Sequence, residues 1–192
     1  MNRFLNLLIL GLMMSLPLVA SASSHPPLEV VPSLDLPTYM GRWYSIAAFP
    51  QFYESGCIAS QADYTLKENG DVEVINSCRE KTFDGKWRIA RGTGHKVSDE
   101  TNAKLKLTFF LLFKGDYWVI DLGANYEYSV VASPDYDSLW ILSRTRTMDS
   151  ALLNTLIERT AAKGFDMNRL KMMPQPPEES SSFLQDFSFM QE

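Results

Sequence analysis

The sequence holds only two cysteines and two histidines in 192 residues. These residue types are the usual ligands of structural zinc, which needs four close together, whereas His25 and His95 lie far apart. No metal site is therefore expected. The sequence also lacks a G-x-S-x-G elbow, a Walker-type glycine-rich loop and a His-Glu-x-x-His pair. These absences argue against the common catalytic chemistries, so we predict neither an enzyme nor a cofactor.

Basic charge is also in short supply. The chain has 18 lysines and arginines against 23 acidic residues, a net charge of −5, and its basic residues form no cluster. Because nucleic-acid backbones are held mainly by clustered basic side chains, nucleic acid is not an expected partner. The one long apolar run, "FLNLLILGLMMSLPLV", is interrupted by Pro17 and is shorter than the about 20 residues that cross a bilayer.

That run has the form of a leader. It follows the polar start Asn2-Arg3 and precedes Ala20-Ser21-Ala22, small residues that suit signal peptidase. We predict a cleavable signal peptide over 1–22 and export to the periplasm, with association with the outer membrane or secretion left open. A lipoprotein leader would end at a cysteine, which is absent here, so no lipid anchor is expected.

Proline marks both ends of the exported chain. Residues 23–34 contain three prolines and are expected to form an extended arm, and 175–192 are rich in proline, glutamate and serine and are expected to be mostly disordered. The tail carries a late apolar patch, Phe183 to Met190. The domain between these ends is placed at 35–174.

This domain contains eight segments typical of strands, separated by turn signals at intervals of about 8 to 15 residues. The segments are 42–49, two within 58–78 on either side of the turn 68–70, 86–96, 103–113, 116–122, 127–133 and 138–144. Residues 36–40 after Asp35 suggest one helical turn, and 147–163 form the one long amphipathic helix. The prediction is an all-β, eight-stranded antiparallel up-and-down barrel with a C-terminal helix packed on its outside.

Three short motifs resemble the signature regions of the lipocalins: Gly41-Arg42-Trp43, Asn125-Tyr126, and Arg144 in "LWILSRT". The stretches "GRWYSIAAFP" and "DYTLKENGDVEVIN" are similar to the bacterial lipocalins, apolipoprotein D and the plant temperature-induced lipocalins, and the resemblance spans 34–173. It implies that Arg144 packs over Trp43 at the closed end of the barrel, a cation–π contact worth about 0.5–2 kcal/mol. These residues would therefore be structural.

Two neighbours of this pair carry smaller expectations. Gly41 would let the entering chain approach the barrel floor without a Cβ clash. The resemblance also implies an aspartate where this chain has Asn125, so an amide is expected to hold that turn in place of a carboxylate.

The barrel interior follows from alternation. If Trp43 points inward, Ser45 and Ala47 should do so too, and counting back from Arg144 gives further inward positions. The predicted ligand pocket comprises Ser45, Ala47, Phe49, Val74, Leu107, Phe109, Tyr128, Trp140 and Leu142. Such a wall suits an acyl chain with its polar head near the mouth, although inward apolar side chains could equally form a filled core.

Cys57 and Cys78 lie nearly symmetrically about the turn at 68–70. A bond between them would close a loop of about 20 residues and add about 3 kcal/mol of stability, and thiols outside the cytoplasm are usually oxidised. We predict a disulfide. The alternative is a reactive thiol, as in the lipocalin-type prostaglandin synthase.

The resemblance implies binding, storage or transport of a lipophilic molecule, such as a fatty acid or lysophospholipid, for maintenance of cell-envelope lipids. Three alternatives stay open: a lipid-modifying enzyme on the same barrel, a haem- or pigment-binding barrel that uses His95, and a protein partner bound by the tail patch. Peripheral contact with a membrane and a homodimer are also open.

Overall fold

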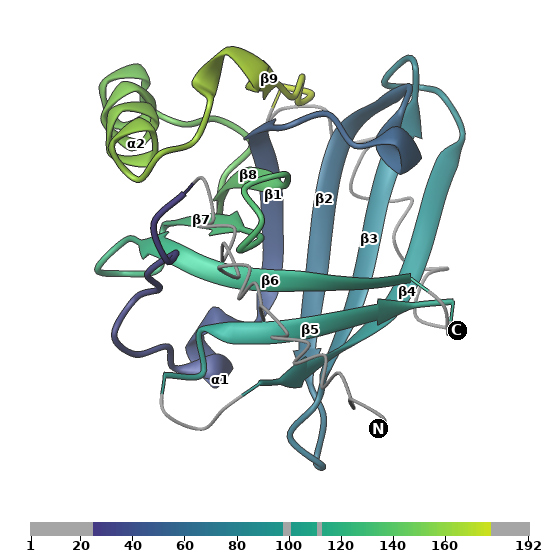
Figure 1. Cartoon of the computed structure of the whole chain (residues 1–192). Coiled ribbons are helices and arrows are strands. Elements are labelled where there is room, and N and C mark those ends of the chain that lie inside the picture. The colour runs from purple at the N-terminus through teal and green to yellow at the C-terminus, as the bar shows by residue number, and fades with distance from the viewer. Residues whose placement is uncertain (1–24, 98–100, 111–112, 178–192) are drawn as a thin grey trace, which may run out of the picture.

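The computed structural model describes residues 25–97, 101–110 and 113–177 (Figure 1). The predicted signal peptide and the tail patch lie outside these residues. In chain order the elements are α1 (Leu36–Tyr39), β1 (Gly41–Ala48), η1 (Phe52–Glu54), β2 (Cys57–Leu66), β3 (Val72–Glu80), β4 (Trp87–Lys96), β5 (Lys104–Phe109), β6 (Phe113–Leu122), β7 (Tyr128–Ala132), β8 (Leu139–Ser143), α2 (Ser150–Ala162), η2 (Met167–Arg169) and β9 (Lys171–Met172).

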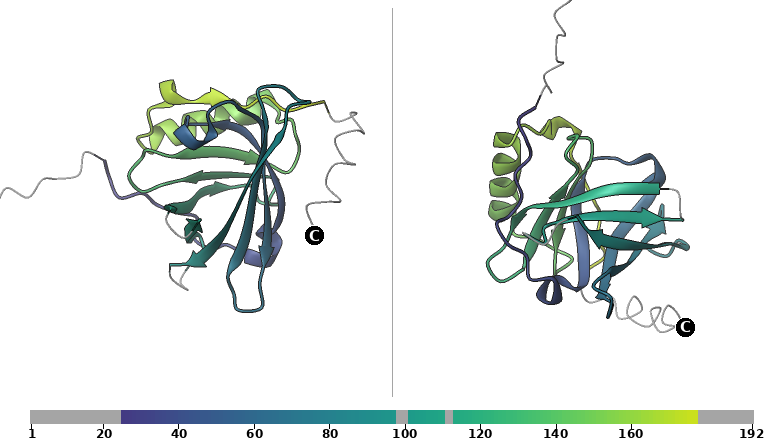
Figure 2. Two further views of the ribbon diagram at one scale, coloured as in Figure 1. Left: turned by 90° about the vertical axis from the view of Figure 1, so that its right-hand side faces the viewer. Right: turned by 60° about the horizontal axis from the view of Figure 1, so that its bottom comes forward.

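The strands form a closed barrel. Each of β2 to β7 pairs antiparallel with the next strand in the chain, and β1 pairs with both β2 and β8. The short strand β9 adds to β1. The views in Figure 2 show the strands curling round on themselves with α2 on the outside. The predicted eight-stranded up-and-down barrel is confirmed.

The two ends of the barrel differ. β1 begins next to α1, which lies at the foot of the barrel in Figure 1, and we call this the closed end. Because successive strands alternate in direction, the connections β1–β2, β3–β4, β5–β6 and β7–β8 all lie at the opposite end, which we call the open end.

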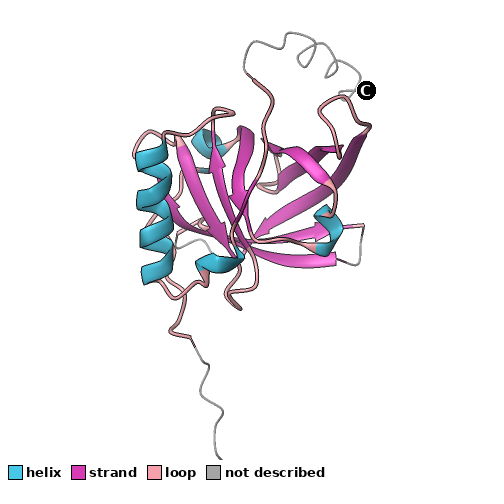
Figure 3. Ribbon diagram, turned by 90° about the horizontal axis from the view of Figure 1, so that it is seen from above, coloured by secondary structure: helices cyan, strands magenta, loops and turns pink. Residues whose placement is uncertain are grey.

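Buried apolar side chains form two clusters on opposite faces of the barrel wall. The inner cluster fills the barrel around Trp43, Tyr39 and Val74. The outer cluster lies between β1, β6, β7 and β8 and the helix α2, whose Leu156 is fully buried. Figure 3 shows α2 lying along the barrel wall. The carboxylate of Asp149 caps the helix by accepting the N–H groups of Ala151 and Leu152, so α2 begins three residues later than predicted.

The turn between β5 and β6 was misplaced from the sequence. Lys114 and Gly115, predicted as the turn, lie inside β6 opposite Thr108 and Leu107. The chain instead leaves β5 after Phe109, and Phe110 has a φ of 49°. The reversal occurs in an apolar run that carries no turn residues, whereas the lysine–glycine pair looked like a turn and is a strand.

The first residues of the tail that was expected to be mostly disordered bond to the barrel. The Gln175 side-chain amide donates to the carbonyl oxygens of Ser45 and Ser60, at 2.8 and 2.9 Å. The N–H of Ala59 donates to the Pro174 carbonyl oxygen at 2.8 Å, and Arg146 donates to that of Pro177 at 3.2 Å. These bonds hold 174–177 against the barrel wall.

Candidate ligand-binding site

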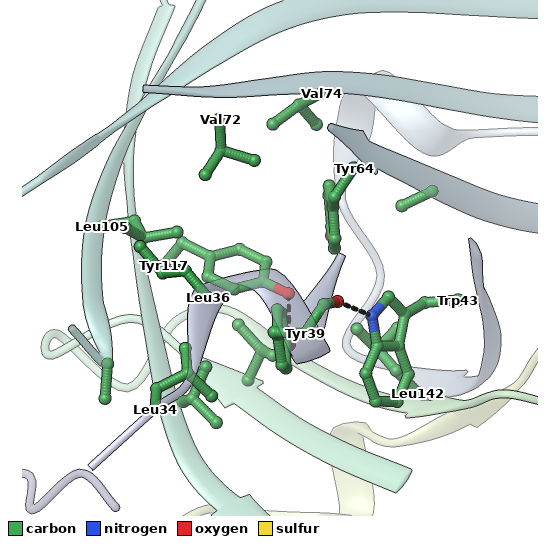
Figure 4. Close-up of a cluster of buried hydrophobic side chains, with 14 residues drawn as sticks. Leu34, Leu36, Tyr39, Trp43, Tyr64, Val72, Val74, Leu105, Tyr117 and Leu142 are labelled. Atoms are coloured by element: carbon green, nitrogen blue, oxygen red, sulfur yellow. Dashed lines mark hydrogen bonds between the residues drawn. The ribbon is translucent and has the colours of Figure 1, made fainter. Parts of the chain in front are cut away.

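The closed end is sealed by Trp43 and Arg144. The Trp43 ring is fully buried, and the guanidinium carbon of Arg144 lies 3.8 Å from its centroid. Arg144 also donates to the carbonyl oxygens of Arg42 and Thr38, both at 2.9 Å. The Trp43 indole N–H donates to the Tyr39 carbonyl oxygen at 2.9 Å, drawn as a dashed line from the blue nitrogen in Figure 4. This is the structural contact that the resemblance implies.

Gly41 and Asn125 act differently from expectation. A Cβ at Gly41 would lie 3.5 Å from Arg144, an ordinary contact, so clash is not the reason for glycine; its φ of +88° is. In the turn before β7, the Glu127 carboxylate accepts the Asn125 N–H at 3.0 Å. Glu127 thus supplies a carboxylate to the turn expected to be held by the Asn125 amide. Tyr126 adopts a φ of 59° there.

The half of the barrel nearest the closed end is filled. The Tyr39 hydroxyl lies 2.7 Å from that of Tyr117 and 2.8 Å from Ser129 Oγ, and the rings of Tyr39 and Tyr64 stack with centroids 6.1 Å apart. Figure 4 shows these tyrosines meeting beneath Val74. Burial raises the pKa of Tyr39 to about 12, so the phenol stays neutral. The void left among them is about 10 Å³, about enough for a water molecule and too small for an acyl chain.

A bulge in β1 reverses the predicted facing of two pocket residues. Ser45 lies opposite Leu142, but the register then shifts so that Ala47 lies opposite Ile141 and Ala48 opposite Trp140. Ala48 therefore faces inward. Ala47 and Phe49 belong to the outer cluster, so their predicted place in the cavity is wrong. The run from Ser45 to Phe49 is small or apolar throughout and is buried on both faces, so no change of pattern marks the extra residue.

Tyr128 also faces outward. Its hydroxyl donates to Asp121 at 3.2 Å, and its ring packs in the outer cluster. Its predicted place in the pocket is therefore wrong: Tyr126, two residues earlier, lies in a turn with positive φ, where alternation does not apply. The inward residues of β7 are Ser129 and Val131, opposite Leu142 and Trp140.

The remaining predicted pocket residues come together inside the barrel. Val74 and Leu142 are buried in the inner cluster, and Leu107, Phe109 and Trp140 are partly buried against it. Leu107 and Val74 also line the small void beside Tyr39 and so border the filled half, whereas Phe109 and Trp140 lie nearer the open end. We call the part of the barrel interior nearest the open end the upper chamber. The strand register adds three inward residues to its wall that were not predicted from the sequence, namely Ala48, Asn76 and Ala90.

Glycine allows close contact between β4 and β5 at two positions, Gly92 and Gly94. Gly92 lies opposite Phe109 in the β4–β5 pair. A Cβ there would lie 2.7 Å from the Phe109 ring, far inside van der Waals contact. The missing side chain lets this aromatic ring lie across β4 without displacing the strand. Polar atoms are few on this wall; the Ser45 hydroxyl is buried and has no hydrogen-bond partner among the described residues.

The β1–β2 connection reaches over the open end to β4. Arg88 of β4 donates to the carbonyl oxygens of Ser55 and Tyr53, at 2.9 and 2.8 Å. The predicted disulfide between Cys57 and Cys78 is present at the end of this connection, with Cα atoms 5.5 Å apart. Figure 1 shows the connection passing in front of β2 and β3.

One carboxyl group on this connection lies beside the upper chamber. Burial raises the pKa of Glu54, while the Trp140 indole and the charge of Arg88 oppose that shift. Since Trp140 is an inner-wall residue, the carboxyl group of Glu54 lies where a ligand would enter. A lone glutamate in a loop gave no sequence signal of this position.

The residues needed by two of the alternative functions, haem binding and thiol chemistry, are not placed to carry them out. His95 Nδ1 lies 2.7 Å from an Asp71 carboxylate oxygen, and its strand neighbour Gly94 faces inward, so His95 points away from the interior and cannot hold a haem there. Both cysteines are consumed in the disulfide, which leaves no thiol for lipid chemistry. Within the described residues no cluster of three potential metal ligands occurs, and no helix is long and apolar enough to cross a membrane.

Comparison with known proteins decides the family. A family model described as a lipocalin-like domain matches residues 34–175. The chain belongs to the lipocalin family. The lipocalin is 34% identical to temperature-induced lipocalin-1 of Arabidopsis thaliana, covering 81% of this chain and 88% of the plant protein. It is 36% identical to the outer membrane lipoprotein Blc of Citrobacter freundii, covering 82% and 90%, and 32% identical to mouse apolipoprotein D, covering 76% and 78%.

Solved structures agree on the fold. Insecticyanin from the tobacco hornworm Manduca sexta superimposes with a TM-score of 0.64 at 19% identity, over 79% of this lipocalin and 86% of insecticyanin. At that identity the likeness concerns the fold alone.

Proposed function

We propose that this lipocalin is a carrier that binds, stores or transports a single-chain lipid, such as a fatty acid or lysophospholipid, in the upper chamber. The observation that carries the proposal is the contrast between the two halves of the barrel. The lower half is filled by tyrosines, whereas the upper wall presents the partly exposed apolar side chains of Phe109 and Trp140. Each methylene group buried there would add about 0.8 kcal/mol of binding free energy.

The division of the barrel limits how the lipid lies. The void beside Tyr39 is too small for a methylene chain, so the acyl chain would end above the tyrosines and its head would lie at the open end. Glu54 is the charged group beside Trp140 there. An ionised carboxyl group would repel a free fatty-acid carboxylate and tolerate a neutral or zwitterionic head.

The cellular role is proposed by analogy. The name of the Blc relatives places those proteins at the outer membrane, and residues 1–22 have the form of a leader. We propose that this lipocalin is exported and maintains envelope lipids. The predicted absence of enzymatic activity agrees with the loss of both cysteines to the disulfide.

A pair of adjacent alanines tests the chamber. Ala48→Phe puts a ring into the upper chamber opposite Trp140 and is expected to weaken lipid binding at least about tenfold by filling its space. Ala47→Phe puts the same ring into the packed outer cluster, where it should cost about 1–3 kcal/mol of stability and leave binding unchanged.

Native mass spectrometry and displacement of a fluorescent lysophospholipid measure the binding, and urea unfolding measures the stability. An intact lipid should accompany the purified protein and be lost in Ala48→Phe alone. A chemically altered lipid would instead favour the enzyme alternative. Equal binding by both variants would place the ligand outside the upper chamber.

Glu54 gives a prediction of pH dependence. Burial raises the pKa of Glu54 in the folded state above its ordinary value of 4.5, so the folded protein disfavours the ionised carboxylate. The resulting loss of stability grows as the pH rises from 4.5 through the folded-state pKa. Glu54→Gln removes the penalty. The stability of the variant relative to wild type should therefore be more favourable at pH 7 than at pH 4, measured by urea unfolding at both. Glu158→Gln, on the exposed side of α2, is the matched control; an identical pH trend in the two variants would contradict the assignment.

A further inference from the structure

Four aromatic side chains at the open end are exposed to solvent. On the β1–β2 connection Phe52 is 78% exposed and Tyr53 is 49% exposed. Phe83, on the β3–β4 connection, is 39% exposed, and Phe110, which follows β5, is 68% exposed. These positions come from three separate connections that the topology brings to the same end, around the upper chamber. We call the four residues the aromatic rim.

The scaffold beneath the rim is firmly held. Arg88 binds the carbonyl oxygens of Tyr53 and Ser55, and the N–H of Lys81 donates to the Gly56 carbonyl oxygen at 2.8 Å. The β3–β4 connection is fixed in turn by Arg79, which donates to the Gly85 carbonyl oxygen at 3.0 Å. Phe52 and Tyr53 contact each other edge to face, with centroids 5.2 Å apart, and this contact still leaves both exposed. Phe52, Tyr53 and Phe83 therefore project from supported loops.

Charge around the rim is mixed. The open-end connections and the first residues after them carry the cations Lys81, Lys86 and Lys114 and the anions Glu54, Asp84, Asp135 and Asp137. A surface of mixed charge produces no strong electrostatic potential of one sign that would attract a highly acidic or basic partner. Separated aromatic tips amid mixed charges instead match the headgroup region of a bilayer, where aromatic rings are favoured and both charges occur.

We propose that the aromatic rim inserts into the surface of a phospholipid bilayer and sets the mouth of the barrel against the lipid. The purpose assigned to this contact, loading and unloading of the ligand, rests on the proposed function; the contact itself does not. A carrier docked in this way would pass a lipid between chamber and membrane without exposing the acyl chain to water.

Flotation with phosphatidylcholine vesicles tests the proposal on the full purified chain. The wild-type chain is expected to float with the vesicles, and Phe52→Ser with Phe110→Ser should lower its partition about a hundredfold, roughly tenfold for each partly inserted ring. The control is Val97→Ser. Val97 is 54% exposed on the β4–β5 connection, at the closed end, and its change should leave flotation as in wild type.

Four results would overturn the proposal. The first is a wild-type chain that does not float, and the second is an equal loss of flotation in Val97→Ser. The third is flotation that requires phosphatidylglycerol in the vesicles. The fourth is a wild-type dimer that becomes a monomer in the double variant while flotation is unchanged. The last would make the rim an interface between copies of the chain.

The ligand is followed separately, by native mass spectrometry without vesicles. Equal lipid occupancy in wild type and double variant, together with lost flotation, would support docking by the rim. Rim-dependent flotation of a barrel that holds no lipid would also support docking, while removing the proposed carrier function.

Discussion

Replacing Trp43 with alanine is expected to lower the free energy of unfolding by about 3–5 kcal/mol. The indole is fully buried between the Arg144 guanidinium group, 3.8 Å from the ring centroid, and the Tyr39 ring, 5.0 Å away between centroids. Its removal leaves a cavity and deprives the Arg144 guanidinium group of its cation–π contact. The Tyr39 carbonyl oxygen also loses the hydrogen bond from the indole N–H. Urea unfolding followed by circular dichroism measures the loss.

Trp140→Ala provides the contrast. Trp140 is only partly buried and lies on the wall of the upper chamber, so its removal should cost less stability and weaken lipid binding more than Trp43→Ala does. Ligand displacement on both variants separates the two roles. If Trp43→Ala kept full stability while its lipid affinity disappeared, the assignment of Trp43 to the barrel floor would be wrong.

The order of the strands could be predicted from the sequence because local signals agree with one another. The turn before β3 illustrates this: Gly70 has a φ of +84°, and the chain reverses there as the asparagine–glycine pair indicates. In β5, lysines alternate with Leu105 and Leu107, and the structure buries the leucine face. Each such signal lies within a few residues, so it survives without knowledge of the tertiary structure.

The site was less predictable because its geometry depends on irregularities and on distant partners. One extra residue in β1 exchanges the facing of Ala47 and Ala48, and the sequence around it is uniformly small or apolar. The filling of the lower barrel depends on Tyr39, which enters from α1, meeting Tyr64 and Tyr117 from across the sheet. Alternation along a single strand predicts neither the bulge in β1 nor the meeting of these tyrosines. The signature contact between Trp43 and Arg144 was predictable because a family resemblance carries long-range information.

Removal of the disulfide, by Cys57→Ser together with Cys78→Ser, is expected to cost about 2–4 kcal/mol of stability. The bond closes a loop with a sequence separation of 21 residues, so its loss frees the unfolded chain. In the folded state it also ties the end of the β1–β2 connection to β3. Arg88 still holds Tyr53 and Ser55 in the variant, so we expect a less stable barrel with the open end still formed and lipid still bound.

Thermal unfolding with and without a reducing agent checks the disulfide prediction. Reductant should lower the melting temperature of the wild-type chain toward that of the double variant and should leave the variant itself unchanged, because the chain contains no other cysteine. Two reactive thiols in the native wild-type chain would contradict the bond. A variant that kept its stability but lost its lipid would contradict the prediction in another way. It would show that the disulfide shapes the β1–β2 connection and the mouth of the chamber. We do not expect this result because the Arg88 bonds to that connection are retained.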